Sequence, residues 1–199
     1  GIKNNYNLLL KNVNTSGKNS TAYKEDFEAE VLSSFLFETS YPLMRNGINF
    51  NNYLTPKLAL KYSPNNMKNL SGNDRRIDTN NIWEMNRIGS SKTVESGQSL
   101  TIGTEYKKSK KISKYLIEND AFDPDDPIDV LEISLATMFR DEENENMPIS
   151  SSLGNKSSDI IGHIGISPNK IFKASYNFNL DNNFDILKYS GLSTTLNVN

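Results

Sequence analysis

Apolar and polar residues alternate with a period of two along most of this chain. Alternation of this kind is typical of β-strands that present one apolar and one polar face. Eight segments follow the pattern and are predicted as strands: 6–10, 27–37, 54–62, 100–106, 130–140, 160–166, 172–180 and 184–198. No segment shows a convincing helical period, so the connections do not contain helical crossovers. The sequence therefore predicts an all-β antiparallel meander of about eight strands.

Three of the predicted strands contain irregular positions. Leu32 and Leu36 fall on the polar parity of the second strand and are exceptions to its alternation. Pro56 lacks an N–H donor for the ladder, which predicts a local bulge or an edge position in the third strand. In the last strand two apolar residues share the parity of Lys188, and a bulge near 190–191 would relieve that conflict.

Charged residues in the middle strands keep to one parity. A lysine on the lipid side near mid-membrane costs ~2–4 kcal/mol, whereas a lysine facing a wet lumen costs little. We therefore expect the apolar parity to face lipid and the charged parity to face a lumen. The predicted lipid-facing residues are Leu58, Leu60, Leu100, Ile102, Leu131, Ile133, Leu135, Phe172, Tyr176 and Phe178. The predicted lumen-facing residues are Lys57, Lys61, Glu105, Glu132, Lys173 and Asn177.

The composition leaves the predicted architecture unchanged, but it argues against several classes of function. The mean hydropathy is -0.59, but a barrel strand needs apolar residues only at alternate positions, so a low mean does not exclude a membrane barrel. The 22 basic and 24 acidic residues nearly cancel, which gives no reason to expect a nucleic-acid partner. The absence of cysteine excludes disulfide scaffolds and thiol chemistry. Because the chain opens on Gly1 without a methionine, we expect a piece of a longer protein.

Catalytic and metal-binding motifs are missing from the sequence. His163 is the single histidine, so no multi-histidine metal site can form, and it is interpreted as a polar wall residue rather than a general base. The acidic cluster within 120–129 lacks the central glycine and distal glutamate of an EF-hand loop, which favours a solvated loop over a calcium site. We expect no enzymatic activity, cofactor or metal.

The segment 63–97 is the longest polar stretch, and it carries its own apolar residues. Ile82, Trp83 and Met85 lie among arginine, asparagine and aspartate side chains. A long loop with apolar anchors is usually packed or functional, so this one is predicted to fold onto a wall. Its candidate lumen-plugging residues are Arg76, Asp78, Asn81, Trp83, Asn86 and Arg87. The alternative is a surface loop of a soluble sandwich that Trp83 pins to the core.

Residue spacing in this segment resembles a known family. Arg-x-x-Asp-x-x-Asn-Ile-x-x-x-Asn-Arg over 75–87, followed by Glu-x-Gly-x-x-Leu-x-x-Gly over 95–103, is similar to the C-terminal barrel domain of LptD, the LPS-assembly outer-membrane protein. The stretches 40–64 and 147–181 fit the same family in the same order. Residues 88–92 depart from it, because the family tends to have an aromatic, a glycine and an Asp-Arg pair there.

The resemblance implies a fold and a function. Residues 1–199 would be part of a large transmembrane β-barrel in a Gram-negative outer membrane, without the N-terminal periplasmic domain and the remaining strands. The family takes lipopolysaccharide (LPS) from a periplasmic bridge through that missing domain and inserts it into the outer leaflet, with an LptE-like lipoprotein plug inside the barrel. The alternatives are a soluble β-sandwich that binds carbohydrate and a small porin-like barrel.

Loop length predicts which side of the membrane each connection occupies, since such barrels have short periplasmic turns and longer external loops. Placing the short turn 167–170 in the periplasm fixes the others by alternation. The connections predicted to be external are 14–24, 63–97 and 141–157, and those predicted to be periplasmic are 40–51, 107–129 and 167–170. An external 63–97 loop would fold back over the lumen mouth and help to seal it.

Overall fold

The computed structural model of the chain describes residues 1–19, 25–111 and 128–197. Its strands are β1 (Lys3–Thr15), β2 (Glu28–Ser40), β3 (Leu43–Asn46), β4 (Phe50–Ser63), β5 (Gly97–Lys110), β6 (Asp129–Arg140), β7 (Ile160–Ile166), β8 (Phe172–Leu180) and β9 (Leu187–Leu196). Two short 3₁₀ turns, η1 (Asn81–Trp83) and η2 (Ile149–Ser151), lie in the connections. Across the described ranges no helix is long or apolar enough to cross a membrane.

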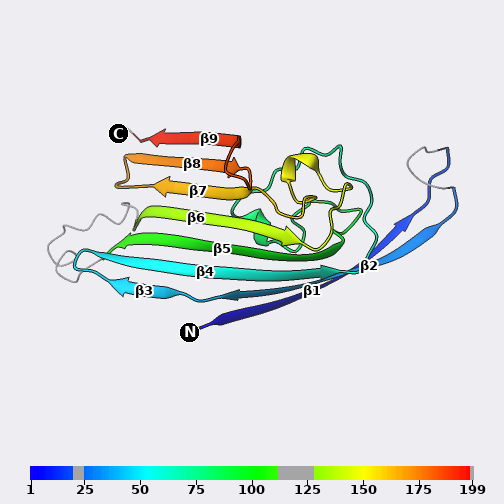
Figure 1. The fold of residues 1–199 in the computed structure, drawn as a ribbon, viewed down its shortest axis with the longest axis horizontal. Coiled ribbons are helices and arrows are strands. Elements are labelled where there is room, and N and C mark those ends of the chain that lie inside the picture. The colour runs from blue at the N-terminus through cyan, green and yellow to red at the C-terminus, as the bar shows by residue number, and fades with distance from the viewer. Residues whose placement is uncertain (20–24, 112–127, 198–199) are drawn as a thin grey trace.

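The strands form one antiparallel sheet in the order β1-β2-β4-β5-β6-β7-β8-β9, with β3 paired to β4 (Figure 1). The predicted meander is confirmed, and β3 is an additional short strand within the connection predicted at 40–51. The sheet is not closed, because β1 and β9 lie at its two ends. β5 continues to Lys110, beyond its predicted end, and the acidic cluster at 120–126 lies outside the described residues.

β2 and β3 act as one arm of a long hairpin with β4. Ser40 faces Lys57 and Leu43 faces Leu54, so the register is unchanged across the break. In an antiparallel ladder, every second pair of opposed residues exchanges two backbone hydrogen bonds. Tyr41 donates to the Pro56 carbonyl at 3.1 Å, and the return bond is the one that Pro56 cannot make. The missing donor therefore interrupts the neighbouring strand, and the bulge predicted at Pro56 is absent from the continuous β4–β5 ladder.

Opposed residues also share a face of the sheet, so the registers assign every strand residue to one of two faces. One, the inner face, contains Lys57 and Lys61 of β4, which oppose Gly103 and Ser99 of β5. All predicted lumen-facing residues lie on the inner face, and all predicted lipid-facing residues lie on the opposite, outer face. The predicted division of side chains between two faces is therefore confirmed.

The outer face is apolar and open along the sheet. Leu60 is 47% exposed, Ile102 43% and Leu192 73%. Among the described strand residues, the charged side chains of this face include Arg45 of β3, next to the 47–49 turn, and Lys108 and Lys110, at the end of β5. The Lys108 ammonium lies 4.4 Å from the centre of the Phe50 ring.

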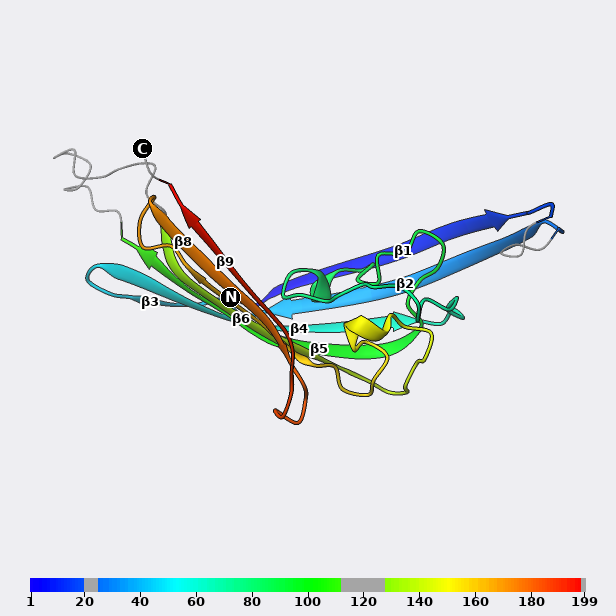
Figure 2. The same ribbon diagram turned by 90° about the horizontal axis from the view of Figure 1, so that it is seen from above.

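The inner face is covered in part by two connections, residues 64–96 between β4 and β5 and residues 141–159 between β6 and β7. Both lie against the same side of the curved sheet (Figure 2). Leu32 and Leu36, the exceptions in the predicted alternation, are buried on this inner face. The second strand therefore keeps its period of two, and both of its faces carry apolar residues because protein covers the inner one.

β9 contains an irregularity at a different position from the predicted one. Ser190 and Gly191 pair regularly with Phe178 and Asn177, and the register shifts at Lys188 instead. The Lys188 ammonium lies 2.7 Å from the Asp159 carboxylate. The bulge therefore coincides with the residue whose charge broke the sequence pattern, and an ion pair across the sheet end accounts for it.

Candidate functional site: the loop on the inner face

The connection 64–96, here called the long loop, contains a tight polar turn before η1. The Asp78 carboxylate accepts hydrogen bonds from the backbone N–H groups of Asn80 and Asn81, both at 2.8 Å. The Asn81 side-chain oxygen accepts one from the Asp78 N–H at 2.9 Å. Aspartate and asparagine stabilise turns in this way. The turn directs the next residue, Ile82, toward the sheet.

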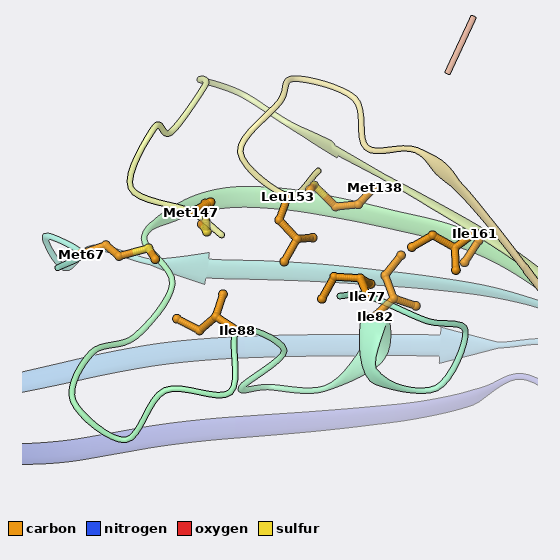
Figure 3. Close-up of a cluster of buried hydrophobic side chains, with 9 residues drawn as sticks. Met67, Ile77, Ile82, Ile88, Met138, Met147, Leu153 and Ile161 are labelled. Carbon is orange, nitrogen blue, oxygen red and sulfur yellow. The ribbon is translucent and has the colours of Figure 1, made fainter. Parts of the chain in front are cut away.

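An apolar core joins the long loop to the wall beneath it. Ile82 is only 1% exposed, and it packs with residues of β6, β7 and the second connection (Figure 3). The buried cluster consists of Met67, Ile77, Ile82, Ile88, Ala136, Met138, Met147, Leu153 and Ile161. The loop is therefore docked on the sheet, as its apolar residues predicted.

Trp83 occupies a space that depends on a glycine. A Cβ atom at Gly103 would lie 2.7 Å from the Trp83 ring and 2.5 Å from the Leu135 carbonyl oxygen, so a larger residue does not fit. The Lys57 ammonium lies 4.5 Å from the centre of the same ring. A cation over an aromatic face is attractive, and this contact ties the loop to β4.

Glu95 lies at the centre of a buried ion-pair cluster. Arg87 bonds both of its carboxylate oxygens, through Nε at 2.7 Å and Nη2 at 2.5 Å. The Lys61 ammonium lies 2.8 Å from one oxygen, and Nη2 of Arg140 lies 3.3 Å from the other. All four side chains are between 1 and 4% exposed. We call these four residues the Glu95 cluster.

Further hydrogen bonds connect the Glu95 cluster to its surroundings. Arg87 donates to the hydroxyls of Ser99 at 2.7 Å and Thr101 at 3.2 Å, both on β5. Lys61 of β4 donates to the Met85 carbonyl at 2.7 Å, and Arg140 of β6 donates to the Ser96 carbonyl at 3.0 Å. The cluster therefore fastens the loop to three adjacent strands.

The charge state of Glu95 follows from its neighbours. Burial raises the pKa of the Glu95 carboxyl, because it removes water from the charged form. The charges of Arg87 and Lys61, together with their hydrogen bonds, outweigh burial and hold that pKa well below its usual range. Glu95 is therefore ionised at physiological pH.

Comparison with protein families identifies the chain. A family model described as LptD, LPS transport system D, matches residues 4–198. The chain belongs to the LptD family. A search of curated proteins gives no match. The LptD family serves LPS transport and assembly in the outer membrane and is not a known enzyme family.

The six plug residues predicted in this LptD-family chain do not form one cluster. Arg87 lies in the Glu95 cluster, Trp83 lies over Gly103, and Asn81 is buried in the turn before η1. The remaining three are exposed: Asp78 caps the turn, Arg76 stacks on Tyr189 of β9 at 4.2 Å, and Asn86 donates to the Ser90 carbonyl at 3.1 Å. Arg76, Trp83 and Arg87 therefore tie the loop to the wall, and Asp78 and Asn81 order its turn.

Among residues 88–92, Ile88 departs from the LptD pattern, whereas Gly89 keeps its glycine. Ile88 is buried in the apolar core beside Ile82, where it anchors the end of the loop. Gly89 has φ of +67°, a conformation that favours glycine. The apolar side chain at 88 therefore anchors the end of the loop in this chain.

Sequence reasoning noted Glu95, Lys61 and Arg140 separately and did not bring them together. Glu95 belonged to a spacing motif, Lys61 was predicted to face the lumen, and Arg140 ended a predicted strand. The available signal was the shared parity of Lys61 and Arg140, which placed both charges on the inner face. Their convergence on one carboxylate depends on the path of the loop.

Beside the long loop, whose Thr79 and Asn80 help to line it, the inner face has a polar pocket of about 400 Å³. Its lining includes Glu105, Glu132 and His163 from β5, β6 and β7. Nδ1 of His163 lies 2.7 Å from the side-chain oxygen of Asn177, which agrees with its interpretation as a polar wall residue. Within residues 1–19, 25–111 and 128–197, no group of three acidic, histidine or cysteine residues could hold a metal ion.

Proposed function

We propose that this chain forms an arc of the wall of an LptD-type outer-membrane barrel, which receives LPS from the periplasm and inserts it into the outer leaflet. The observation that carries the proposal is the separation of the sheet into an open apolar face and a polar face packed with loops. Transmembrane barrel strands alternate in this way between lipid and lumen. The basic residues Lys108 and Lys110 at the strand end suit the membrane interface.

The exposed apolar side chains of the outer face are evidence against a soluble carbohydrate-binding sandwich. Soluble monomers rarely expose contiguous apolar patches larger than a few hundred Å². A sandwich would cover this face with a second sheet, and the described strands all belong to one sheet. A small closed barrel is disfavoured because β1 and β9 remain at opposite ends of the strand order.

Both sheet edges support a larger barrel. Unpaired backbone N–H and C=O groups cost several kcal/mol each in the hydrocarbon region, so lipid-exposed edges do not occur there. β1 and β9 each have a partner on one side within the described sheet. Further strands of the same barrel would pair with the free sides, and a periplasmic domain of the longer protein would deliver the substrate.

The long loop supports a sealing role inside that barrel. It occupies the inner face over β4 to β7 and is held by an apolar core and by the Glu95 cluster. A wide polar lumen requires a barrier between transport events, and a docked loop provides one. The polar pocket beside it, lined by Glu105 and His163, leaves part of the wall for an LptE-like lipoprotein.

Displacing the loop tests this function in cells that depend on the full-length protein. Ile82→Asp buries a charge in the apolar core and should release the loop. Asn80→Asp, which adds the same charge at an exposed position of the same loop, is the matched control. We expect the first variant to admit large antibiotics while surface LPS is retained, and the control to resemble wild type.

Two outcomes would contradict the proposal. Unchanged antibiotic entry in Ile82→Asp, with the loop shown to be displaced by protease accessibility, would refute the sealing role. Recovery of the wild-type protein in the soluble fraction, rather than in outer membranes and detergent micelles, would refute the wall assignment.

A further inference from the structure

The charges of the Glu95 cluster do not balance. Three buried cations, Lys61, Arg87 and Arg140, surround one carboxylate. Two nitrogens of Arg140, Nε and Nη1, are buried without a hydrogen-bond partner in the described structure. The adjacent Asp141 acts on Arg140 by its charge, but it is exposed. The four side chains of the cluster therefore carry a net charge of +2, and Glu95 supplies the single negative charge among them.

The members of the cluster differ in what they do to the loop. Lys61 and Arg140 belong to β4 and β6, whereas Arg87 belongs to the loop. Glu95 belongs to the same loop, so docking brings a third cation together with the single carboxylate to two cations that are fixed on the wall. Like charges at short range repel more strongly when buried. Glu95 is the attraction that overcomes this repulsion.

We propose that Glu95 is the positioning residue that latches the long loop to the wall, against repulsion among Lys61, Arg87 and Arg140. The latch is asymmetric. Loss of the single carboxylate leaves three uncompensated buried cations, while loss of Lys61 removes part of the surplus and leaves Glu95 bonded to both arginines. The latch itself is argued from the contacts of the docked loop. Only its expected effect on permeability rests on the proposed sealing function.

The different effects of losing Glu95 and of losing Lys61 distinguish an electrostatic latch from simple packing of the four side chains. If the four side chains only filled space, Glu95→Gln and Lys61→Met would be similarly damaging, because each preserves the approximate shape of the residue. Removing one partner of a buried ion pair is strongly destabilising when it strands a charge. Replacing a whole buried ion pair by apolar groups is often neutral, because no charge is left uncompensated. Lys61→Met meets the same condition, since Glu95 keeps its bonds to both arginines. Only the latch predicts a large effect of Glu95→Gln and a small effect of Lys61→Met.

Cysteine labelling of the full-length protein in outer-membrane preparations tests this difference. A cysteine at Ile82, which is buried under the docked loop, reports loop release to a maleimide, after any native thiols are blocked. We expect Glu95→Gln to accelerate labelling at least about tenfold and Lys61→Met to change it less than about twofold. The double variant Glu95→Gln/Lys61→Met should label more slowly than Glu95→Gln alone.

Controls keep the result interpretable. A cysteine at exposed Asn80 should label at the same rate in every variant, and far-ultraviolet circular dichroism should show the same strand content. Equal labelling of Ile82→Cys in Glu95→Gln and Lys61→Met would overturn the latch. Faster labelling in Glu95→Gln with unchanged channel conductance would support the latch and refute the sealing function, so the two failures are distinguishable.

Discussion

Ile133 and Ser134 are neighbours in β6 that point to opposite faces of the sheet. Arginine at 133 would lie on the outer face, where a basic residue at the bilayer midplane costs ~2–4 kcal/mol. Arginine at 134 would lie on the inner face beside the polar pocket. We expect Ile133→Arg to reduce the amount of assembled full-length protein severely and Ser134→Arg to reduce it little, as measured in outer-membrane fractions. Equal tolerance of both variants would contradict a lipid-facing outer face.

The Glu95 cluster also predicts how pH acts on the loop. A carboxylate with a depressed native pKa contributes stability above its unfolded pKa, about 4.3 for glutamate, and loses it as pH falls through the native value. Because the native pKa of Glu95 is well below that range, docking should persist from pH 8 to about pH 4. Hydrogen exchange of residues 77–88, corrected for intrinsic rates, should show constant protection. A loss of protection between pH 6 and pH 4 would contradict the charge state assigned to Glu95.

The sequence could assign a strand residue to one face of the sheet, but it could not identify the partners of its side chain. Alternation with a period of two assigned Lys61 to the inner side without any structure. Glu95 lies 34 residues from Lys61 and 45 from Arg140, and no local pattern relates positions so far apart. The convergence depends on how the loop returns across the sheet, which is a tertiary property.

At the scale of elements, the meander places the connections alternately at the two ends of the sheet. The long loop and the 141–159 connection share one end and contact each other, since the Leu70 N–H donates to the Asn146 carbonyl at 2.8 Å. The turns around 47–49 and 167–171 lie at the other end. This agrees with the predicted alternation, while the side of the membrane stays a prediction.

Surface labelling of intact cells tests that side. Single cysteines at Asn80, Asn49 and Asn169, all exposed, would be introduced into the full-length protein. We expect a membrane-impermeant maleimide to label Asn80→Cys only, because short turns of such barrels face the periplasm. Permeabilised cells, in which all three should react, serve as the control. Labelling of the two turn positions without Asn80→Cys would reverse the orientation.

The strand boundaries and the bulge positions could not all be predicted from the sequence. The face on which each strand residue lies was predicted correctly, because residues on the same face of a strand recur at every second position. The short strand β3 was missed because it depends on its pairing with β4, whose Pro56 lies opposite the break at Tyr41. The last bulge was displaced to Lys188 because a partner at Asp159, 29 residues away, determines its position.

At the scale of the whole molecule, the family and the two-faced sheet could be predicted, but the extent of the loop contacts could not. The chain folds as an open arc whose termini lie at opposite edges (Figure 1). Spacing motifs indicated the LptD family over 40–181, and the family match extends to 4–198. How a polar segment distributes its bonds over many strands depends on side-chain geometry that a linear pattern does not contain.

The long loop touches both flanks of the arc. The Lys11 ammonium of β1 donates to the Ser90 carbonyl at 3.3 Å at one side, and Arg76 stacks on Tyr189 of β9 at the other, with the Glu95 cluster and the apolar core between them. Such contacts make the loop a brace across the arc, because separating the strands from β1 to β9 would break them. A barrel that releases a lipid sideways would therefore open along a seam outside this arc, and the arc would act as the rigid frame against which that seam moves.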